Sequence, residues 1–212
     1  MNKTLYLLWF SDIFILTGFG LATPIMAIFI KETIVGGTIL AAGIASAIFL
    51  SVKALIQIPF SRYIDSHRDR VRWLWTGTFL IITVPIQYLY AKNVLAIYIA
   101  QIVYGIGAGL ASSAWLSLWS THLDKNHEGF EWSIYSATVG LGTGIAALIG
   151  GLLATFFGFS ETIILMGFLS VIGFVILLFV EYKANNENLL NEKIDPMQYH
   201  KKHKLLHEPY HR

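Results

Sequence analysis

The chain has 212 residues, of which 55% are hydrophobic and 13% are charged, and its formal net charge is +2. A soluble domain carries about 25% charged residues, so this composition excludes an ordinary water-soluble fold for most of the chain. The sequence contains no cysteine, which excludes disulfides and cysteine-ligated metals.

Six long apolar runs follow one another along the chain, separated by short charged stretches. A helix needs roughly 20 mostly apolar residues to cross about 30 Å of hydrocarbon. The runs are too long and too uniformly apolar for barrel strands. We therefore predict an all-α membrane protein, a six-transmembrane-helix bundle at 1–182, with spans at about 5–30, 38–60, 73–91, 94–119, 132–157 and 161–181.

Lysine and arginine gather on one side of this topology. Twelve of the fifteen lie near the N-terminus, in the loops at 61–72 and 120–131, or after residue 182, whereas Lys31 and Lys92 lie opposite. Cytoplasmic loops carry an excess of basic residues. The pattern predicts a multi-pass protein of the plasma (inner) membrane with both termini in the cytoplasm.

Five charged or amide side chains lie within or near the apolar runs: Asp12, Lys53, Gln57, Gln87 and Gln101. A charge at bilayer depth costs some kcal/mol unless it faces a partner or water, so these residues are candidates for binding a solute or a proton. Lys53 and Gln57 share one helix face. Alternatively, Asp12 reaches the headgroups and Lys53 snorkels to the interface. Asp12 and Lys53 could also pair with each other.

The fourth span carries a polar and aromatic stripe, with Gln101, Tyr104 and Trp115 at three- and four-residue steps. Such a stripe could line a solute cavity. The alternative is that Gln101 makes a hydrogen bond between helices and Trp115 anchors the membrane interface.

Small residues recur at four-residue spacing in two spans. Gly105 and Gly109 lie in the fourth span, and Gly140 and Gly144 lie in the fifth. This spacing predicts close approach between helices. A fifth span so rich in glycine could also bend as a moving element.

The loop between the second and third spans reads SRYIDSHRDR from residue 61 to residue 70. It resembles the signature loop of major facilitator superfamily (MFS) transporters, which has a glycine, three residues and an aspartate, then basic residues around a second glycine. Asp65 and Arg70 match this pattern, whereas Ser61 and Arg68 replace the glycines.

Three other segments are similar to the same family. Pro24 follows a glycine-containing stretch in the first span, as is common there. The segment 101–107 is similar to an arginine-to-glycine segment, with Gln101 where many proton-coupled exporters carry arginine. Gly140 and Gly144 are similar to the glycine-rich motif of drug and proton antiporters, although its proline is absent.

The resemblance covers about residues 5–181 and implies a free-standing N-terminal half of an MFS transporter. It implies a secondary active transporter of a small solute, not an enzyme, that needs no cofactor and works by alternating access as a homodimer. Antiport and proton coupling through Asp12 fit this interpretation. It further implies that Asp65, Arg68 and Arg70 form a conformational latch that reaches the partner copy's fifth span. The partners expected are a second copy, the solute and the lipid bilayer, with no nucleic acid.

A non-transporting interpretation stays open, in which the six helices form a scaffold or a subunit of a larger membrane complex. The polar tail at 183–212 carries His200, His203, His207 and His211 on one potential helix face. Imidazoles at this spacing could bind a transition metal, but a basic tail attracted to anionic lipid is the simpler interpretation, and we predict no metal site.

Overall fold

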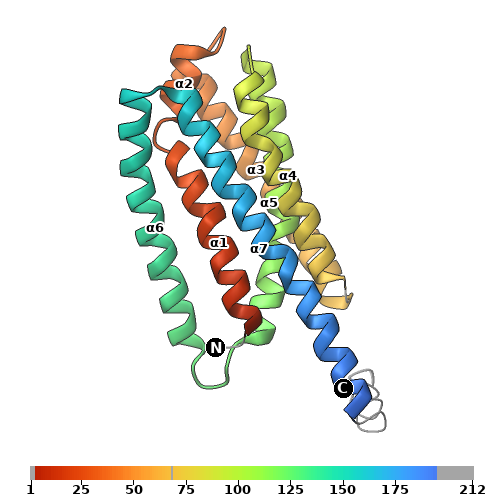
Figure 1. The fold of residues 1–212 in the computed structure, drawn as a ribbon. Helices are drawn as coiled ribbons and strands as arrows, with labels where there is room; N and C mark the ends of the chain where they lie inside the picture. Colours follow the sequence, from red (N-terminus) through yellow and green to blue (C-terminus); the bar gives the residue numbers. More distant parts are fainter. Residues whose placement is uncertain (1–2, 68, 195–212) are drawn as a thin grey trace.

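The computed structural model describes residues 3–67 and 69–194, with side chains through residue 180. These residues form seven α-helices, and the extended pairing among them is limited to one isolated bridge between Val35 and Asn93. The helices are α1 (Lys3–Ala22), α2 (Met26–Thr33), α3 (Ile39–Ser66), α4 (Arg70–Tyr90), α5 (Val94–His122), α6 (Glu128–Phe156) and α7 (Phe159–Ile194) (Figure 1).

The first expected span, 5–30, is divided into two helices, so the prediction of one continuous helix there is wrong. α1 ends at Ala22 and α2 begins at Met26. Pro24 has no N–H to donate, which interrupts the helical ladder. The chain turns instead, and the Ile25 N–H donates to the Ala22 carbonyl at 3.1 Å.

Short polar residues start two of the long helices. Thr38 precedes α3 and its hydroxyl accepts from the Ala41 N–H at 3.0 Å, and Asn93 precedes α5 and accepts from the Ala96 N–H at 3.0 Å. Both bonds satisfy N–H groups that the first turn of a helix leaves unpaired. Gly158, with φ of +112°, turns the chain between α6 and α7, a conformation that favours glycine.

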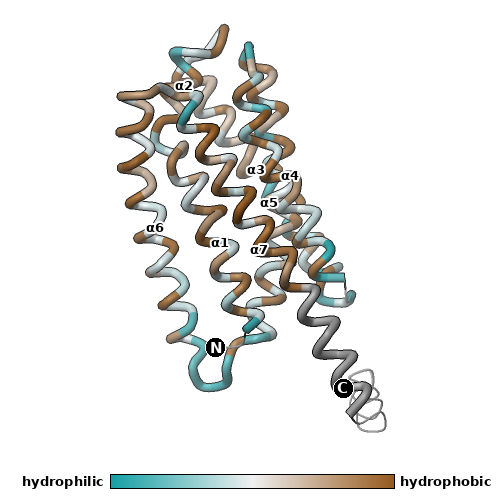
Figure 2. The backbone as a smooth tube through the Cα atoms, in the orientation of Figure 1, coloured by the Kyte–Doolittle hydropathy of each residue, from teal (hydrophilic) through white to brown (hydrophobic). Residues whose placement is uncertain are grey.

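Five of the helices in the described part of the chain are long and apolar enough to cross a membrane: α1, α3, α5, α6 and the part of α7 at 159–180. The chain is therefore a multi-pass membrane protein. α4, which corresponds to the expected span 73–91, is less apolar than these five but lies in the same bundle (Figure 1). Figure 2 shows apolar residues along the middle of the helices and a hydrophilic connection between α5 and α6.

The helices form an open arc. Along it α3 packs on α5, α5 on α4, α4 on α7, α7 on α1 and α1 on α6, whereas α3 and α6 share no substantial contact. The helices α3 and α6 therefore flank the open side of the bundle. Figure 1 places the start of α1 and the end of α7 at the same end of the bundle, together with the α3–α4 and α5–α6 connections. We call this the long-loop end, because the loops expected at 61–72 and 120–131 lie there.

Two helices run further than the expected spans. α3 continues to Ser66 rather than stopping near 60, and α7 continues to Ile194, past the predicted domain boundary at 182. The expected histidine face from His200 to His211 lies outside the described residues.

Candidate functional site

A cavity of about 390 Å³ opens between α1, α3, α5 and α6. Most of its lining is apolar, with side chains from α4 and α7 closing its back. The polar and aromatic residues of the lining are Ser11, Asp12, Phe49, Lys53, Gln57, Thr78, Tyr104, Ser112, Trp115, Trp132 and Tyr135. Five of the six predicted binding residues are thus brought together in one place.

Asp12 stands on the wall formed by α1 and α6. Its carboxylate accepts a hydrogen bond from the Tyr135 hydroxyl of α6. A second bond joins the same two helices, from the Trp9 indole N–H to the Thr138 hydroxyl at 2.9 Å. Tyr135 was not predicted from the sequence, because a lone tyrosine in a glycine-rich span carries no signal of its own.

Lys53 and Gln57 stand on the wall formed by α3, one turn apart, as their spacing predicts. Lys53 lies 13 residues, or about 20 Å, from the end of α3 at Ser66. This depth argues against snorkelling to the long-loop end. No direct ion pair joins Asp12 to Lys53 among the described residues, although both line the cavity.

Small residues of α5 hold the Lys53 wall close. A Cβ on Gly109 would come within 3.0 Å of the Lys53 carbonyl oxygen, and one on Gly105 within 2.9 Å of the Phe49 carbonyl oxygen. One turn further on, the Ser113 hydroxyl donates to the Gln57 carbonyl at 3.1 Å. The predicted close packing at Gly105 and Gly109 therefore exists, and it fixes α3 against α5.

Two aromatic groups bound the cavity along the helix axes. The Tyr104 ring is stacked between the rings of Phe19 and Phe49. Its centroid lies 4.7 Å from that of Phe19 and 4.2 Å from that of Phe49. Nearer the long-loop end, Trp115 packs against Tyr135 at 4.8 Å and stacks on Trp119 at 4.9 Å. The ligand space lies between these layers.

Gln101 is placed elsewhere. It is buried, and its side-chain amide donates to the Tyr88 hydroxyl at 3.0 Å, joining α5 to α4. It does not line the cavity. Of the two interpretations of Gln101, the structure has the hydrogen bond between helices.

The signature loop sits beside a second cavity, of about 530 Å³, at the long-loop end. Asp65 accepts a hydrogen bond from the Ser117 hydroxyl at 3.1 Å, and Arg70 donates to the Thr121 hydroxyl at 3.5 Å. Arg68 lies outside the described residues. The loop is therefore tied to the end of α5 in its own chain.

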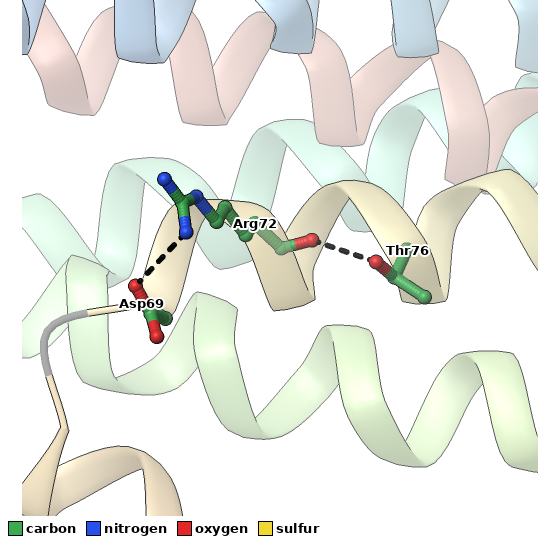
Figure 3. Close-up of polar contacts among 3 residues, drawn as sticks. All are labelled: Asp69, Arg72 and Thr76. Atoms are coloured by element: carbon green, nitrogen blue, oxygen red, sulfur yellow. Dashed lines mark hydrogen bonds and ion pairs between the residues drawn. The ribbon is translucent and has the colours of Figure 1, made fainter.

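Arg72 is bound locally at the start of α4. Its guanidinium lies 3.7 Å from the Asp69 carboxylate, and its carbonyl accepts from the Thr76 hydroxyl at 2.9 Å (Figure 3). Both charged side chains are more than half exposed. Asp69 therefore offsets part of the basic cluster that stands in the loop.

Gly140 and Gly144 behave differently from the glycines of α5. A Cβ added to either would meet nothing within 4 Å. They lie on α6, in whose most apolar segment 11% of the residues are buried. Among the described residues, these two positions therefore do not have the predicted packing role.

Relatives in sequence are transporters about twice as long. An uncharacterized MFS-type transporter of Methanocaldococcus jannaschii is 27% identical over 196 residues, which is 92% of this chain and 50% of the relative. A homologue of a multi-drug resistance efflux pump in Lactococcus lactis is 21% identical over 200 residues, 91% of this chain and 49% of that protein. The chain spans about half the length of the curated relatives it matches.

Solved structures share the fold. A peptide transporter POT in complex with sulfate superposes with a TM-score of 0.73 at 16% identity, over 86% of this chain and 38% of that one. A second POT family transporter gives a TM-score of 0.69 at 14% identity, with the same coverage. The family model and the two curated relatives point to a transporter and not to an enzyme. Because the family model described as Major Facilitator Superfamily matches residues 8–207, the chain belongs to that superfamily.

Proposed function

We propose that this chain forms one six-helix half of a secondary transporter, which moves a small solute by alternating access. A second copy of the chain would supply the other half. The observation that carries the proposal is the cavity with Asp12 and Lys53 in its walls, on the side of the bundle left open between α3 and α6. Charged groups at membrane depth are tolerated where they face water or a substrate.

Exposure of α3 and α6 supports a second half. Only 17% and 11% of the residues in their most apolar segments are buried, the two lowest fractions among the five candidate spans. The two halves of this fold are parallel repeats related by an axis along the membrane normal, so two copies in the same orientation can take both places. In that arrangement α6 of each copy faces α3 of the other across an isologous interface.

In this proposal α4 is the sixth span, and the long-loop end is cytoplasmic in the inner membrane. Packing of α4 between α5 and α7 supports its place as a span. The basic residues of loop 61–72 and the tail favour the cytoplasm for the long-loop end.

Proton coupling through Asp12 is part of the proposal, in an antiport cycle. Asp12 is the one acidic side chain among the described residues of the cavity lining, and it accepts a hydrogen bond from the Tyr135 hydroxyl. A carboxyl that exchanges its proton for solute would link the two fluxes. Asp12→Asn should abolish the dependence of uptake on a pH gradient, while exchange between labelled and unlabelled solute stays measurable at a saturating solute concentration.

The latch is the last part of the proposal. Asp65 would exchange its Ser117 bond for the N-terminus of the partner's α6, where a helix dipole attracts an anion. Asp65→Ala should shift the accessibility of a cysteine placed in the cavity. Unchanged accessibility and unchanged flux would count against the latch.

The dimer is tested by crosslinking, which the sequence makes clean because it contains no cysteine. Leu50 on α3 and Ile145 on α6 are both exposed. Leu50 lies 11 residues after the start of α3 and Ile145 lies 11 residues before the end of α6, which places them at similar depth. A chain carrying Leu50→Cys and Ile145→Cys should form a disulfide-linked dimer in native membranes, whereas Ile86→Cys on the far side of the bundle should not. Crosslinking to a protein of another mass would show that a different partner supplies the second half.

Flux separates transport from the scaffold alternative. The purified crosslinkable species, reduced, is reconstituted in proteoliposomes and screened for solute-dependent counterflow. Counterflow that stops when the disulfide is formed and resumes on reduction supports a moving interface. The absence of flux for every solute class, in a preparation that forms the dimer, would favour a scaffold.

A further inference from the structure

The cavity holds two opposite charges that are not joined to each other. Asp12 lies on the α1–α6 wall and Lys53 on the α3 wall, with no direct ion pair between them among the described residues. In an apolar cavity each charge is unfavourable until a partner compensates it. An ionised carboxylate can accept about four hydrogen bonds, so Asp12 keeps free acceptor capacity beyond the one that Tyr135 fills.

Neutral donors also line the cavity on the side of Lys53, Gln57 from α3 and Ser112 from α5, which packs against α3. The side chains of Gln57 and Ser112 make no hydrogen bond to any described residue. An ammonium, an amide N–H and a hydroxyl all donate, and an acceptor group such as a carboxylate would satisfy them together. The wall around Lys53 therefore suits the negative end of a ligand.

The Asp12 wall suits the positive end. Trp115 and Tyr135, whose rings lie 4.8 Å apart, both line the cavity, and Tyr135 is bonded to Asp12. A carboxylate beside aromatic faces attracts a small organic ammonium through charge and through cation–π contact. The remaining lining is mainly aliphatic and aromatic, which suits an apolar ligand body.

We propose that the cavity binds a small zwitterion of the amino-acid type, with its ammonium at Asp12, its carboxylate at Lys53, and an apolar side chain between the aromatic layers. This inference rests on the proposed function in taking the cavity as the transport site. A ligand with only one charge would leave the opposite wall unpaired, and that penalty is the basis of discrimination.

The test compares three molecules of one shape: phenylalanine, phenethylamine, which lacks the carboxylate, and 3-phenylpropionate, which lacks the ammonium. Binding is measured at equilibrium on the full chain in nanodiscs, by competition against radiolabelled phenylalanine and by direct binding of each labelled compound. Phenylalanine should bind at least about tenfold more tightly than either analogue.

Variants assign the charges. Lys53→Met should bind phenylalanine and phenethylamine equally well, and should still prefer phenylalanine over 3-phenylpropionate. Asp12→Asn should bind phenylalanine and 3-phenylpropionate equally well, and should still prefer phenylalanine over phenethylamine. Lys53→Arg should retain the wild-type order, which shows that loss in Lys53→Met does not come from misfolding. Lys92→Met removes an exposed lysine outside the cavity and should change nothing.

Three results would overturn the inference. One is equal binding of phenylalanine and either analogue, and another is no binding of any of the three. The third is wild-type affinity for phenylalanine in the double variant Asp12→Asn with Lys53→Met. That result would mean that Asp12 and Lys53 only neutralise each other and do not bind the ligand. Counterflow of the same compounds is measured separately, so zwitterion binding without flux would sink the transport proposal and leave the site.

Discussion

Asp12, Tyr135 and Trp115 show how single side chains shape the cavity. The Tyr135 hydroxyl orients the Asp12 carboxylate, and its ring packs against Trp115. The indole N–H groups of Trp115 and Trp119 are buried without an acceptor in the described part of the chain. A buried donor left unpaired costs about 1–3 kcal/mol, which the packing of the rings has to offset.

Tyr135→Phe removes the hydroxyl and keeps the ring. A hydrogen bond to a charged group contributes about 1.5–3 kcal/mol, so we expect solute binding or counterflow to fall about 10- to 100-fold, while the chain stays folded. The matched control is Tyr90→Phe, since Tyr90 is 80% exposed at the end of α4. Equal losses in both variants would show that the effect is not specific to Asp12.

Gln101 and Tyr88 form a structural pair, and their variants should affect stability alone. Gln101→Leu leaves the buried Tyr88 hydroxyl without its partner and should lower the free energy of unfolding by about 1–3 kcal/mol. Adding Tyr88→Phe should recover most of that loss. Thermal unfolding in detergent measures the stability of the single and the double variant. A change in solute affinity in Gln101→Leu would show that Gln101 contributes to the binding site after all.

Helix pairs set the positions of these residues. α3 and α5 touch through glycine and serine, with backbone atoms of α3 directly over Gly105 and Gly109. Because close backbone contact leaves no room for a side chain, α3 and α5 behave as one body. The face of α6 around Gly140 offers the same small residues but has no neighbour in this chain.

Gly109→Ala tests the α3–α5 contact. The added methyl group would lie 2.8 Å from the Ile56 Cβ, so α3 must shift, and overpacking of this kind costs about 1–3 kcal/mol. Gly43→Ala is the control, because a Cβ there meets nothing within 4 Å and alanine favours the helix. Unfolding temperatures should fall for the first variant only.

The whole molecule is an open arc whose unpaired edges are α3 and α6. Large exposed apolar side chains such as Leu141 and Leu148 continue along α6 beside its free glycines. In a membrane such a surface can face lipid, but a cavity that opens on the same side needs a second wall to hold a solute. The open side of the arc therefore leaves room for a second set of helices, as the proposed function requires.

Filling the α6 face tests this arrangement. Gly140→Leu with Gly144→Leu should leave the single chain folded, since both positions are open, and should abolish the Leu50–Ile145 crosslink and the flux. Ile86→Trp, which adds bulk to an exposed residue of α4, should preserve both. Normal flux in the double leucine variant would contradict the proposed interface.

The sequence predicts some parts of this site and not others, for physical reasons. Lys53 and Gln57 could be placed on one wall because helical periodicity alone sets their relation. Gln101 could not be distinguished from the cavity residues, because a polar side chain shows the same helical spacing whether it lines a cavity or packs between two helices. Tyr135 depends on a contact between α1 and α6, which no local pattern encodes. Pro24 was noticed, but the apolar run through it predicted one continuous span, and apolar composition does not reveal a break in the helix.

The contacts divide the six long helices into two groups of three, α3, α4 and α5 in one and α1, α6 and α7 in the other, joined chiefly along the α4–α7 seam. That seam includes the bond from the Trp75 indole N–H to the Leu177 carbonyl at 3.2 Å. Lys53 rides on the first group and Asp12 on the second. A twist about that seam would change the separation of the two charges within a single chain, without any motion between halves.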